Sequence, residues 1–236
     1  EWFMKATRIK TDMAEGTGVA EGAQLQFKGL LSPVLPDVKF PLESSRSSGL
    51  LSPIVSLDTV NGIDVMQPFY WDIAPNRDAT LITRAMSKRG VGLEGEFRYL
   101  EPQYSGQARL NWLPHDPLRG ERRWGLMTQH SGSVSTGLEG IGNISTALAI
   151  NRVSDDNYWR DFPRSYLGGM GLPGAQVALT QRVLPSTGML SWARDGFSMV
   201  GLVQRWQTQQ DVSVPITPPY DRAPQITMRY GKWNDS

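Results

Sequence analysis

The stretch PFYWDIAPNRDATLITRAMSKRGVGLEGEFRYLEP, residues 68–102, decides the fold of this chain. Apolar and polar residues alternate along it, so that Phe97 and Tyr99 fall on one face of an extended chain and Glu94 and Arg98 fall on the other. Turn-forming residues interrupt the alternation at Pro-Asn and again at Lys-Arg-Gly. The stretch therefore predicts consecutive antiparallel strands joined by short turns, each with one apolar and one polar face.

The same alternation recurs along most of the chain and predicts an all-β protein. Polar loops at 115–122, 154–174 and 209–224 alternate with tight turns, as expected of a barrel with short turns at one rim and long loops at the other. Alternations are shorter near the start, so we interpret 1–30 as the last strands of a separate β domain and 31–236 as a second domain. The predicted strands are 31–41, 49–57, 62–72, 79–87, 91–100, 106–114, 123–131, 141–153, 175–183, 187–195, 197–208 and 225–233.

Two kinds of all-β protein fit this pattern. Strands of soluble proteins are commonly about 5–6 residues long, whereas a tilted transmembrane strand needs about 9–11 residues, and several predicted strands reach the longer figure. Aromatic residues near predicted strand ends, such as Trp71, Trp112 and Tyr230, would suit the aromatic girdles of a membrane barrel, although aromatic residues are common in strands generally. The pattern favours a transmembrane barrel and leaves a soluble β-sandwich open.

Composition excludes several classes of function. Lys and Arg total 24 and Asp and Glu total 23, and this balance argues against a strong field for nucleic acid. The absence of cysteine excludes CxxC metal sites, disulfide frameworks and thiol nucleophiles. No apolar run approaches the about 18–20 residues of a transmembrane helix, so a membrane role would have to be built from strands. Because the chain begins at Glu1 without a leader and stops at Ser236 directly after a strand-like run, we expect a fragment of a longer protein.

Candidate catalytic residues are few. The chain has two histidines, His115 and His130, and His130 precedes Ser131. Neighbouring residues of a strand point to opposite faces, so this pair is badly placed to form a Ser-His nucleophile, and a polar strand end is the simpler interpretation. Asp155 and Asp156 lack the spaced oxygen ligands of a calcium loop, and no histidine pair has metal-ligand spacing. We predict no catalytic residue, no metal site and no cofactor.

Three prolines fall where the second predicted domain begins. Pro36 and Pro41 lie inside the first predicted long strand, and Pro53 lies inside the second. Proline removes a hydrogen bond from the strand ladder and is tolerated at an edge or a bulge. In a closed barrel, these prolines would weaken the seam between the first and last strands. The alternative interpretation is that these residues belong to a connector and not to strands.

A group of residues around the first turn carries a resemblance to a known family. The group is Tyr70, Trp71, Ala74, Pro75, Asn76, Asp78 and Ala79. Together with MSKRG at 86–90 and GEFRYL at 95–100, their order and spacing resemble LptD, the family of lipopolysaccharide-assembly outer-membrane proteins also called organic solvent tolerance protein OstA. The resemblance is strongest from about 30 to 160 and weaker after that.

The resemblance implies an outer-membrane component of the lipopolysaccharide transport and assembly machinery of a Gram-negative bacterium, and not an enzyme. The implied fold is the N-terminal part of a large antiparallel transmembrane β-barrel, preceded by the end of a periplasmic β-jellyroll. Lipopolysaccharide would pass through the barrel lumen and a lateral seam into the outer leaflet, with Pro41, Pro53 and, as a further candidate, Pro36 at that seam. The implied partners are lipopolysaccharide, a plug lipoprotein like LptE, a periplasmic bridge protein like LptA and the outer membrane.

Two features depart from the family pattern. The segment ESSRSSG at 43–49 is less basic than the family tends to be, which argues against a contact with lipid phosphate at that turn. The cysteines that tie the periplasmic domain of the family to its barrel are absent, and they lie mostly in regions that this chain does not include.

Five residues on predicted polar faces are candidates for the lumen or for contact with lipopolysaccharide: Glu94, Glu96, Arg98, Arg109 and Asn111. The guanidinium groups of Arg98 and Arg109 suit phosphates, but they also suit a structural salt-bridge ladder with the two glutamates. Two rival functions stay open. A generic porin-like barrel would share the alternation, and an outer-membrane lipid hydrolase would need one of the histidines.

Overall fold

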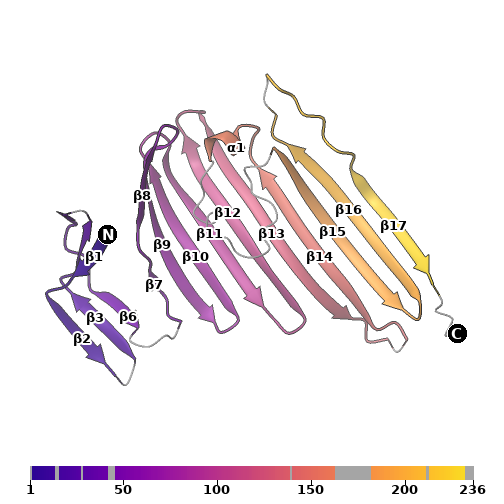
Figure 1. The fold of residues 1–236 in the computed structure, drawn as a ribbon, viewed down its shortest axis with the longest axis horizontal. Coiled ribbons are helices and arrows are strands. Elements are labelled where there is room, and N and C mark those ends of the chain that lie inside the picture. Colours follow the sequence, from indigo (N-terminus) through magenta and orange to yellow (C-terminus); the bar gives the residue numbers. More distant parts are fainter. Residues whose placement is uncertain are drawn as a thin grey trace.

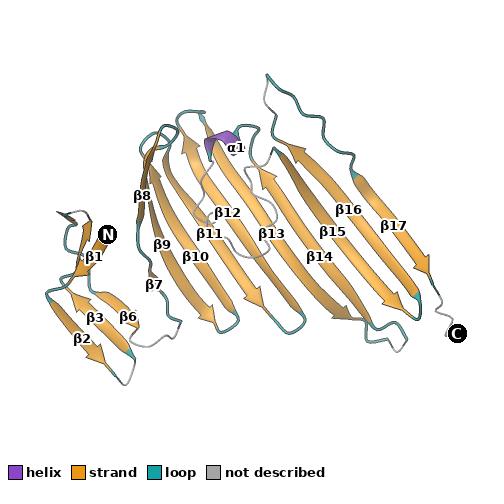
Figure 2. Ribbon diagram, viewed as in Figure 1, coloured by secondary structure: helices purple, strands orange, loops and turns teal. Residues whose placement is uncertain are grey.

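The computed structural model describes residues 2–13, 16–27, 29–41, 46–138, 140–162, 182–210 and 213–231. Its strands form one 11-stranded sheet and two separate three-stranded sheets (Figure 1). Every pairing in the three sheets is antiparallel. The one helix in the described part of the chain is α1 (Tyr158–Asp161), a single turn (Figure 2). The prediction of an all-β, antiparallel protein is confirmed.

The large sheet is a meander in which each strand from β9 onward pairs with the next in sequence. Two short strands, β7 (Gly49–Leu50) and β8 (Ile54–Asp58), follow one another along the free edge of β9. The remaining strands are β9 (Gly62–Ala74), β10 (Arg77–Met86), β11 (Gly90–Leu100), β12 (Tyr104–Asp116), β13 (Glu121–Ser135), β14 (Asn143–Val153), β15 (Val183–Arg194), β16 (Phe197–Thr208) and β17 (Arg222–Tyr230).

The long strands match the predicted ones closely. Strands β9 to β16 contain between 10 and 15 residues each, and β17 contains 9. These lengths equal or exceed the about 9–11 residues of a tilted transmembrane strand. The predicted strand at 175–183 falls outside the described residues, apart from its last two positions.

The small sheets hold the beginning of the chain and lie beside the β8 edge of the large sheet (Figure 1). One is ordered β1-β4-β5 and the other β2-β3-β6. Their strands are β1 (Trp2–Lys5), β2 (Arg8–Asp12), β3 (Thr17–Glu21), β4 (Gln24–Phe27), β5 (Leu30–Leu31) and β6 (Val38–Pro41).

The prediction of one long strand at 31–41 is wrong. The segment holds the end of β5 and all of β6, and both strands pair inside the small sheets. Pro33 and Pro36 lie in the loop between them, where proline cannot donate to a ladder. Pro41 ends β6 opposite Thr17, so neither Pro36 nor Pro41 lies in the large sheet. The strand pairing therefore divides after Pro41, later than the predicted boundary at residue 30.

The predicted strand at 49–57 is also interrupted. Residues 51–53 lie outside β7 and β8, and Pro53 is the last of them. The neighbouring strand β9 has a proline of its own at this point, Pro68, whose carbonyl accepts a hydrogen bond from the Leu51 N–H at 3.0 Å. The Gln67 side-chain amide donates to the Leu51 carbonyl at 2.8 Å. A side chain thus replaces part of the backbone ladder at this edge.

Alternation gives the large sheet two different faces. We call the face that packs against α1 the inner face, and the opposite one the outer face. Side chains of the inner face in β9 to β13 are largely buried, whereas apolar side chains of the outer face are exposed. Exposed apolar side chains of the outer face include Ile63, Phe69, Trp71, Ile73, Leu81, Val91, Leu93, Phe97, Leu110, Trp112, Trp124, Leu148, Leu190, Phe197, Met199, Ile226, Met228 and Tyr230.

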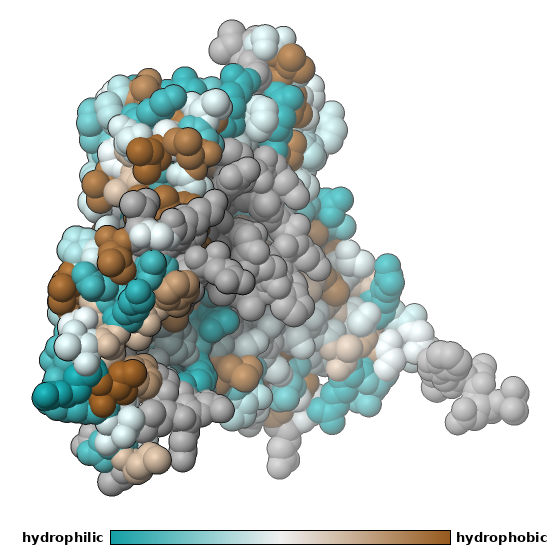
Figure 3. Space-filling model, turned by 60° about the vertical axis from the view of Figure 1, so that its left-hand side comes forward, coloured by the Kyte–Doolittle hydropathy of each residue, from teal (hydrophilic) through white to brown (hydrophobic). Residues whose placement is uncertain are grey.

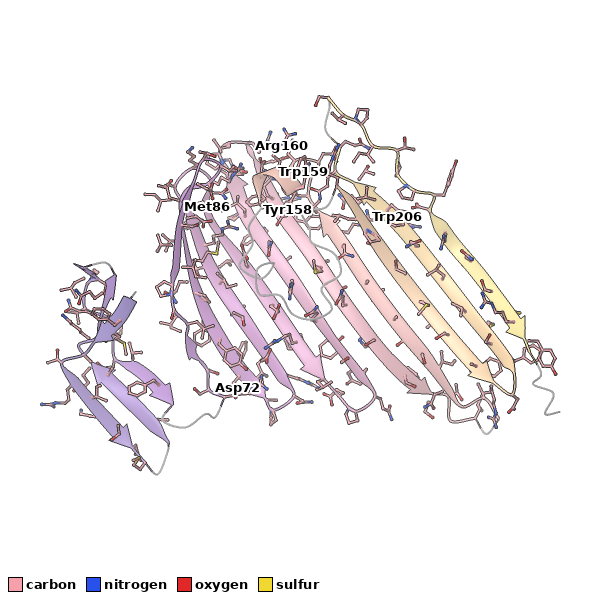
Figure 4. All side chains as sticks on the ribbon, viewed as in Figure 1. Asp72, Met86, Tyr158, Trp159, Arg160 and Trp206 are labelled. Carbon is pink, nitrogen blue, oxygen red and sulfur yellow. The ribbon has the colours of Figure 1, made fainter. Side chains whose placement is uncertain are left out.

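An apolar cluster lies on the inner face beneath α1. Tyr158 and Phe162 pack with four apolar residues of the strands, and their rings lie 4.8 Å apart between centroids. Figure 4 shows α1 at the end of the sheet opposite the β9–β10 turn. The buried members of the cluster are Met86, Leu113, Val153, Tyr158, Phe162 and Leu184. The segment 154–162, which follows β14, is therefore held against the sheet by its own apolar residues.

Gly106 makes room for an aromatic pair on the outer face. It lies on β12 between Tyr99 of β11 and His130 of β13. A Cβ at this position would meet the Tyr99 hydroxyl at 2.2 Å and the Gln129 carbonyl oxygen at 2.6 Å. The open space lets the Tyr99 hydroxyl reach over β12 and form a 2.7 Å hydrogen bond with Nδ1 of His130. Glycine on the central strand thus allows side chains two strands apart to bond.

We expect Gly106→Ala to destabilise the protein by about 1–3 kcal/mol, because the new methyl group overlaps a backbone atom that cannot move freely. Gly201→Ala on β16 is the matched control, since a Cβ there has no atom within 4 Å. The control should be neutral or slightly stabilising, as alanine restricts the unfolded chain more than glycine does. The stability of both variants is measured by the thermal unfolding midpoint of the full-length protein in detergent micelles. Equal midpoints for the two variants would contradict the packing argument.

Candidate functional site

Ion pairs form a ladder across the inner face near the β9–β10 turn. Arg98 of β11 donates to Asp78 of β10, with its Nε 2.8 Å from Oδ1 and its Nη2 2.9 Å from Oδ2. Nε of Arg98 also lies 3.5 Å from Glu96, whose second oxygen is 2.5 Å from Nε of Arg109 on β12. Asp78, Glu96 and Arg109 are buried. Charge therefore alternates in sign along a chain of contacts that spans three strands.

A second group of charges is buried further along the same face. Arg84 of β10 donates from Nη2 to Asp64 of β9 at 2.6 Å, and from Nη1 to Glu94 of β11 at 2.9 Å. All three side chains are buried. Removing charges from water costs several kcal/mol per ion, and it is offset only when partners are close and hydrogen-bonded. Arg84 meets that condition because its planar fork serves a carboxylate on each neighbouring strand.

A third group joins the strands to the loop around α1. Arg123 of β13 is fully buried and donates from Nη1 to Asp116 at 3.1 Å and to Asp161 at 2.9 Å. Its Nε lies 2.5 Å from Asp155. The guanidinium also stands 5.1 Å from the Phe162 ring centroid, within range of a cation–π contact. The network consists of Arg89, Arg119, Arg123, Asp116, Asp155 and Asp161.

The carboxyl group of Asp161 shows the electrostatic effect of this network. Burial alone would raise its pKa, but hydrogen bonds from Arg119 and Arg123 and the charge of Arg89 outweigh burial and lower the pKa below its ordinary value. The Tyr158 phenol responds in the opposite way. Burial raises its pKa, and its oxygen accepts a 3.1 Å hydrogen bond from Nδ2 of Asn111.

The structure brings the five predicted polar-face residues onto the inner face. Arg98 and Arg109 both contact Glu96, as the salt-bridge alternative requires, whereas Glu94 pairs with Arg84. The fifth residue, Asn111, lies under α1 and bonds to Tyr158 as described above.

Sequence reasoning missed the charged residues with the lowest exposure, which include Asp64, Arg84, Arg123 and Asp161. A signal for two of them was present. Asp64 and Arg84 stand at polar-face positions of alternating runs, in the same pattern as Glu94. No comparable signal marks Asp161, because it lies outside the strands at the end of the single-turn helix α1, whose position depends on tertiary contacts.

The histidines and serines of the hydrolase alternative do not form a Ser-His pair. His130 bonds to Tyr99 on the outer face, while the Ser131 hydroxyl lies 3.5 Å from the Ser105 hydroxyl on the inner face. His115 is exposed near the end of β12. Within the described ranges, no group of three or more His, Cys, Asp or Glu side chains is arranged to hold a metal ion.

The family-motif residues surround the turn between β9 and β10. Asn76 of this turn donates to Glu101 at 2.8 Å and so ties it to the neighbouring turn. Tyr70 and Asp78 contact Arg46, which precedes β7. Trp71 is exposed on the outer face. The rest of the motif, Ala74, Pro75 and Ala79, ends β9, forms the turn and continues β10.

The apolar outer face lacks a second sheet that covers it, in the part of the chain that the structure describes. Figure 3, viewed from the side of the small sheets, shows apolar residues reaching the molecular surface among polar ones. Monomeric soluble proteins rarely expose a contiguous apolar patch of more than a few hundred Å², and larger ones mark contact with a membrane or another protein. Among the described residues, no helix is long and apolar enough to cross a membrane.

The chain is therefore an all-β protein with a large antiparallel sheet, one face of which is apolar and exposed while the other carries buried charges. Comparisons with known proteins agree on a family. Residues 121–235 match the family model LptD, described as LPS transport system D. The chain is 47% identical over 237 residues to the LPS-assembly protein LptD of Albidiferax ferrireducens, and 48% identical over 229 residues to that of Polaromonas sp.. It is 34% identical over 233 residues to that of Bordetella pertussis.

The chain belongs to the LptD family. The three alignments cover 97% to 99% of the chain. The chain itself spans only 27% to 28% of the length of these relatives. The predicted membership of the LptD family is confirmed.

We expect Arg123→Leu to destabilise the protein by about 3–5 kcal/mol, because it leaves buried aspartates without their shared counter-charge. Arg122→Leu is the matched control on the same strand, where the side chain is exposed. Guanidinium-induced unfolding of the full-length protein measures both variants. Equal losses for Arg122→Leu and Arg123→Leu would show that the network does not hold the loop.

The lowered pKa of Asp161 also predicts how stability depends on pH. Since the folded-state pKa lies below the ordinary value of 3.8, the network contributes stability above that pH and loses it as the pH falls through the folded-state pKa. Asp161→Asn should lower the free energy of unfolding at pH 7. Below about pH 4, the free energy of unfolding should fall less steeply in this variant than in the wild type. Asp156→Asn, at an exposed position, should leave the whole profile unchanged. A decline equally steep in Asp161→Asn and the wild type would contradict this assignment.

Proposed function

We propose that this chain is part of an outer-membrane protein that transports and assembles lipopolysaccharide. One observation carries the proposal: a sheet with an exposed apolar face and a buried charged face occurs in a chain that aligns over 99% of its length with an LPS-assembly protein. The family match supports a role in lipopolysaccharide transport and assembly. The two faces of the sheet support a position between lipid on one side and a polar interior on the other.

In this proposal, the large sheet is part of the wall of a transmembrane β-barrel in the outer membrane of a Gram-negative bacterium. Exposed outer-face side chains such as Leu81, Phe97 and Leu110 would contact lipid acyl chains. The inner face would line the lumen, where ion pairs and amides can face the sugars and phosphates of lipopolysaccharide. In the ion-pair ladder near the β9–β10 turn, Arg98 is the charged residue best suited to a phosphate, because its side chain is 38% exposed while that of Arg109 is 6% exposed.

The proposal assigns the small sheets to the end of a periplasmic β-jellyroll. Support comes from their separate strand pairing and from their place at the beginning of the chain. The partners would be lipopolysaccharide, a plug lipoprotein of the LptE kind in the lumen, and a bridge protein of the LptA kind at the jellyroll. The proposal includes no enzymatic step and no cofactor.

The lateral seam would lie at the edge formed by β7 and β8. Pro53 interrupts this edge, Pro68 faces the interruption, and Gln67 bridges it with a side chain. A strand attached by few backbone hydrogen bonds separates at lower free-energy cost than a continuous one. Pro36 and Pro41 belong to the first small-sheet region and not to this edge, so the seam role rests on Pro53.

We expect Leu81→Arg to block assembly of the full-length protein in the outer membrane. Leu81 is 49% exposed at the centre of the outer face, opposite Phe69 and Gly95. An arginine at the bilayer midplane costs about 2–4 kcal/mol, against about 0–1 kcal/mol near an interface. Val91→Arg is the matched control, since Val91 is 58% exposed on the same face but lies near the strand end.

Heat-modifiable mobility of the protein in outer-membrane fractions measures assembly, and surface labelling of lipopolysaccharide measures transport. Leu81→Arg as the sole copy should reduce both, while Val91→Arg should reduce neither. If the protein tolerated both substitutions equally, the proposal that the outer face contacts lipid would be contradicted. Loss of assembled protein with unchanged surface lipopolysaccharide would favour a porin-like barrel over a transport component.

A further inference from the structure

The short segment before β7 is attached to the large sheet by side chains more than by backbone pairing. β7 pairs with β9 at only two positions, Gly49 with Tyr70 and Leu50 with Phe69. Further along the edge, the backbone N–H of Asp72 donates to the Ser48 hydroxyl at 2.8 Å, so a side chain takes the place of a strand partner. Figure 4 shows Asp72 near the end of β9, beside the point where the chain enters the sheet.

Arg46 makes the largest set of contacts in this segment. Its Nε and Nη2 donate to the Tyr70 hydroxyl at 2.9 and 2.5 Å, and its Nη1 donates to the Pro75 carbonyl at 3.2 Å. Nη2 also contacts the Asp78 carboxylate. Asp72 lies 3.8 Å from Nε. All three guanidinium nitrogens are used, which a lysine ammonium could not reproduce.

The receiving group, Asp78, is held from two sides. Arg98 binds it through two hydrogen bonds from within the sheet, and Arg46 binds it from the segment before β7. The Asp78 side chain is 8% exposed, whereas that of Arg46 is 47% exposed. If Arg46 leaves, Asp78 keeps a counter-charge in Arg98, which holds it through two hydrogen bonds, and Arg46 enters water. Release therefore avoids the uncompensated buried charge that makes most buried pairs hard to break.

We propose that Arg46 is a releasable latch that holds the edge strand β7 against β9 by binding the Tyr70, Pro75 and Asp78 groups at the β9–β10 turn. Arg46 is a positioning residue: it acts on the edge strand through the turn. The inference deepens the proposed function and rests on it, because in that function β7 is part of the edge that borders the lateral seam, and release of β7 from β9 would loosen that edge.

Arg77, in the β9–β10 hairpin that Arg46 contacts, provides a matched control. Arg77 begins β10, is 48% exposed, and donates from Nη2 to Glu101 at 2.6 Å. It therefore resembles Arg46 in exposure and in having a carboxylate partner, but it ties the turn to the next hairpin and not to the edge. Arg77→Gln removes a comparable ion pair without touching the latch.

Hydrogen exchange of the full-length protein in lipid nanodiscs tests the latch directly. Arg46→Gln should speed exchange of backbone amides at 49–51 about fivefold, the factor that corresponds to about 1 kcal/mol for one such pair. Arg46→Lys should give an intermediate rate, because it keeps the charge and loses the fork. Arg77→Gln should leave these amides at the wild-type rate. Unchanged exchange in Arg46→Gln, or equal acceleration in Arg77→Gln, would overturn the proposal.

The salt dependence of exchange provides a second test, which compares the wild type with Arg46→Gln. Raising the salt concentration from about 0.05 to about 0.5 M screens exposed charges, so exchange at 49–51 should speed up in the wild type and stay level in Arg46→Gln. A response of equal size in both would overturn the latch. Exchange does not depend on transport, so absent lipopolysaccharide transport by the wild type would contradict the proposed function while leaving this result to decide the latch.

Discussion

Burial of charge on one face of the large sheet is the constraint on which the rest of the structure depends. Each buried charge needs an opposite charge on a neighbouring strand, as Arg84 has in Asp64 and Glu94. A slip of one residue in the pairing would turn these groups to the outer face and bring apolar residues inward. The ion pairs therefore set the strand register, and the register in turn keeps apolar side chains together on the outer face.

The same constraint explains how elements outside the strands are held. The segment 154–162 supplies Asp155 and Asp161 to Arg123, and its Tyr158 and Phe162 belong to the apolar cluster on the inner face. At the opposite end of the sheet, Arg46 binds Asp78 beside the β9–β10 turn. Both attachments use an arginine fork that reaches groups on separate segments. They differ in exposure, since Arg123 is fully buried and Arg46 is about half exposed, and that difference separates a permanent anchor from a releasable one.

Sequence reasoning located the long strands well and the beginning of the chain poorly. Strands such as β11 and β16 follow from alternation over a dozen neighbouring residues, which is a local signal. The segment 31–41 also alternates, yet its prolines divide it, and its strands pair with β3 and β4 in the small sheets and not with the large sheet. Pattern alone could not decide this, because a strand's period does not say which sheet it joins.

The sequence by itself determined the antiparallel strands, the two faces and the family, because periodicity and the order of turn residues are written in neighbouring positions. Only the tertiary structure decided which charges meet. Asp78 is shared by Arg98, 20 residues away, and Arg46, 32 residues away. Such pairings depend on strand register and on how loops return to the sheet, and neither is encoded within a short window of sequence.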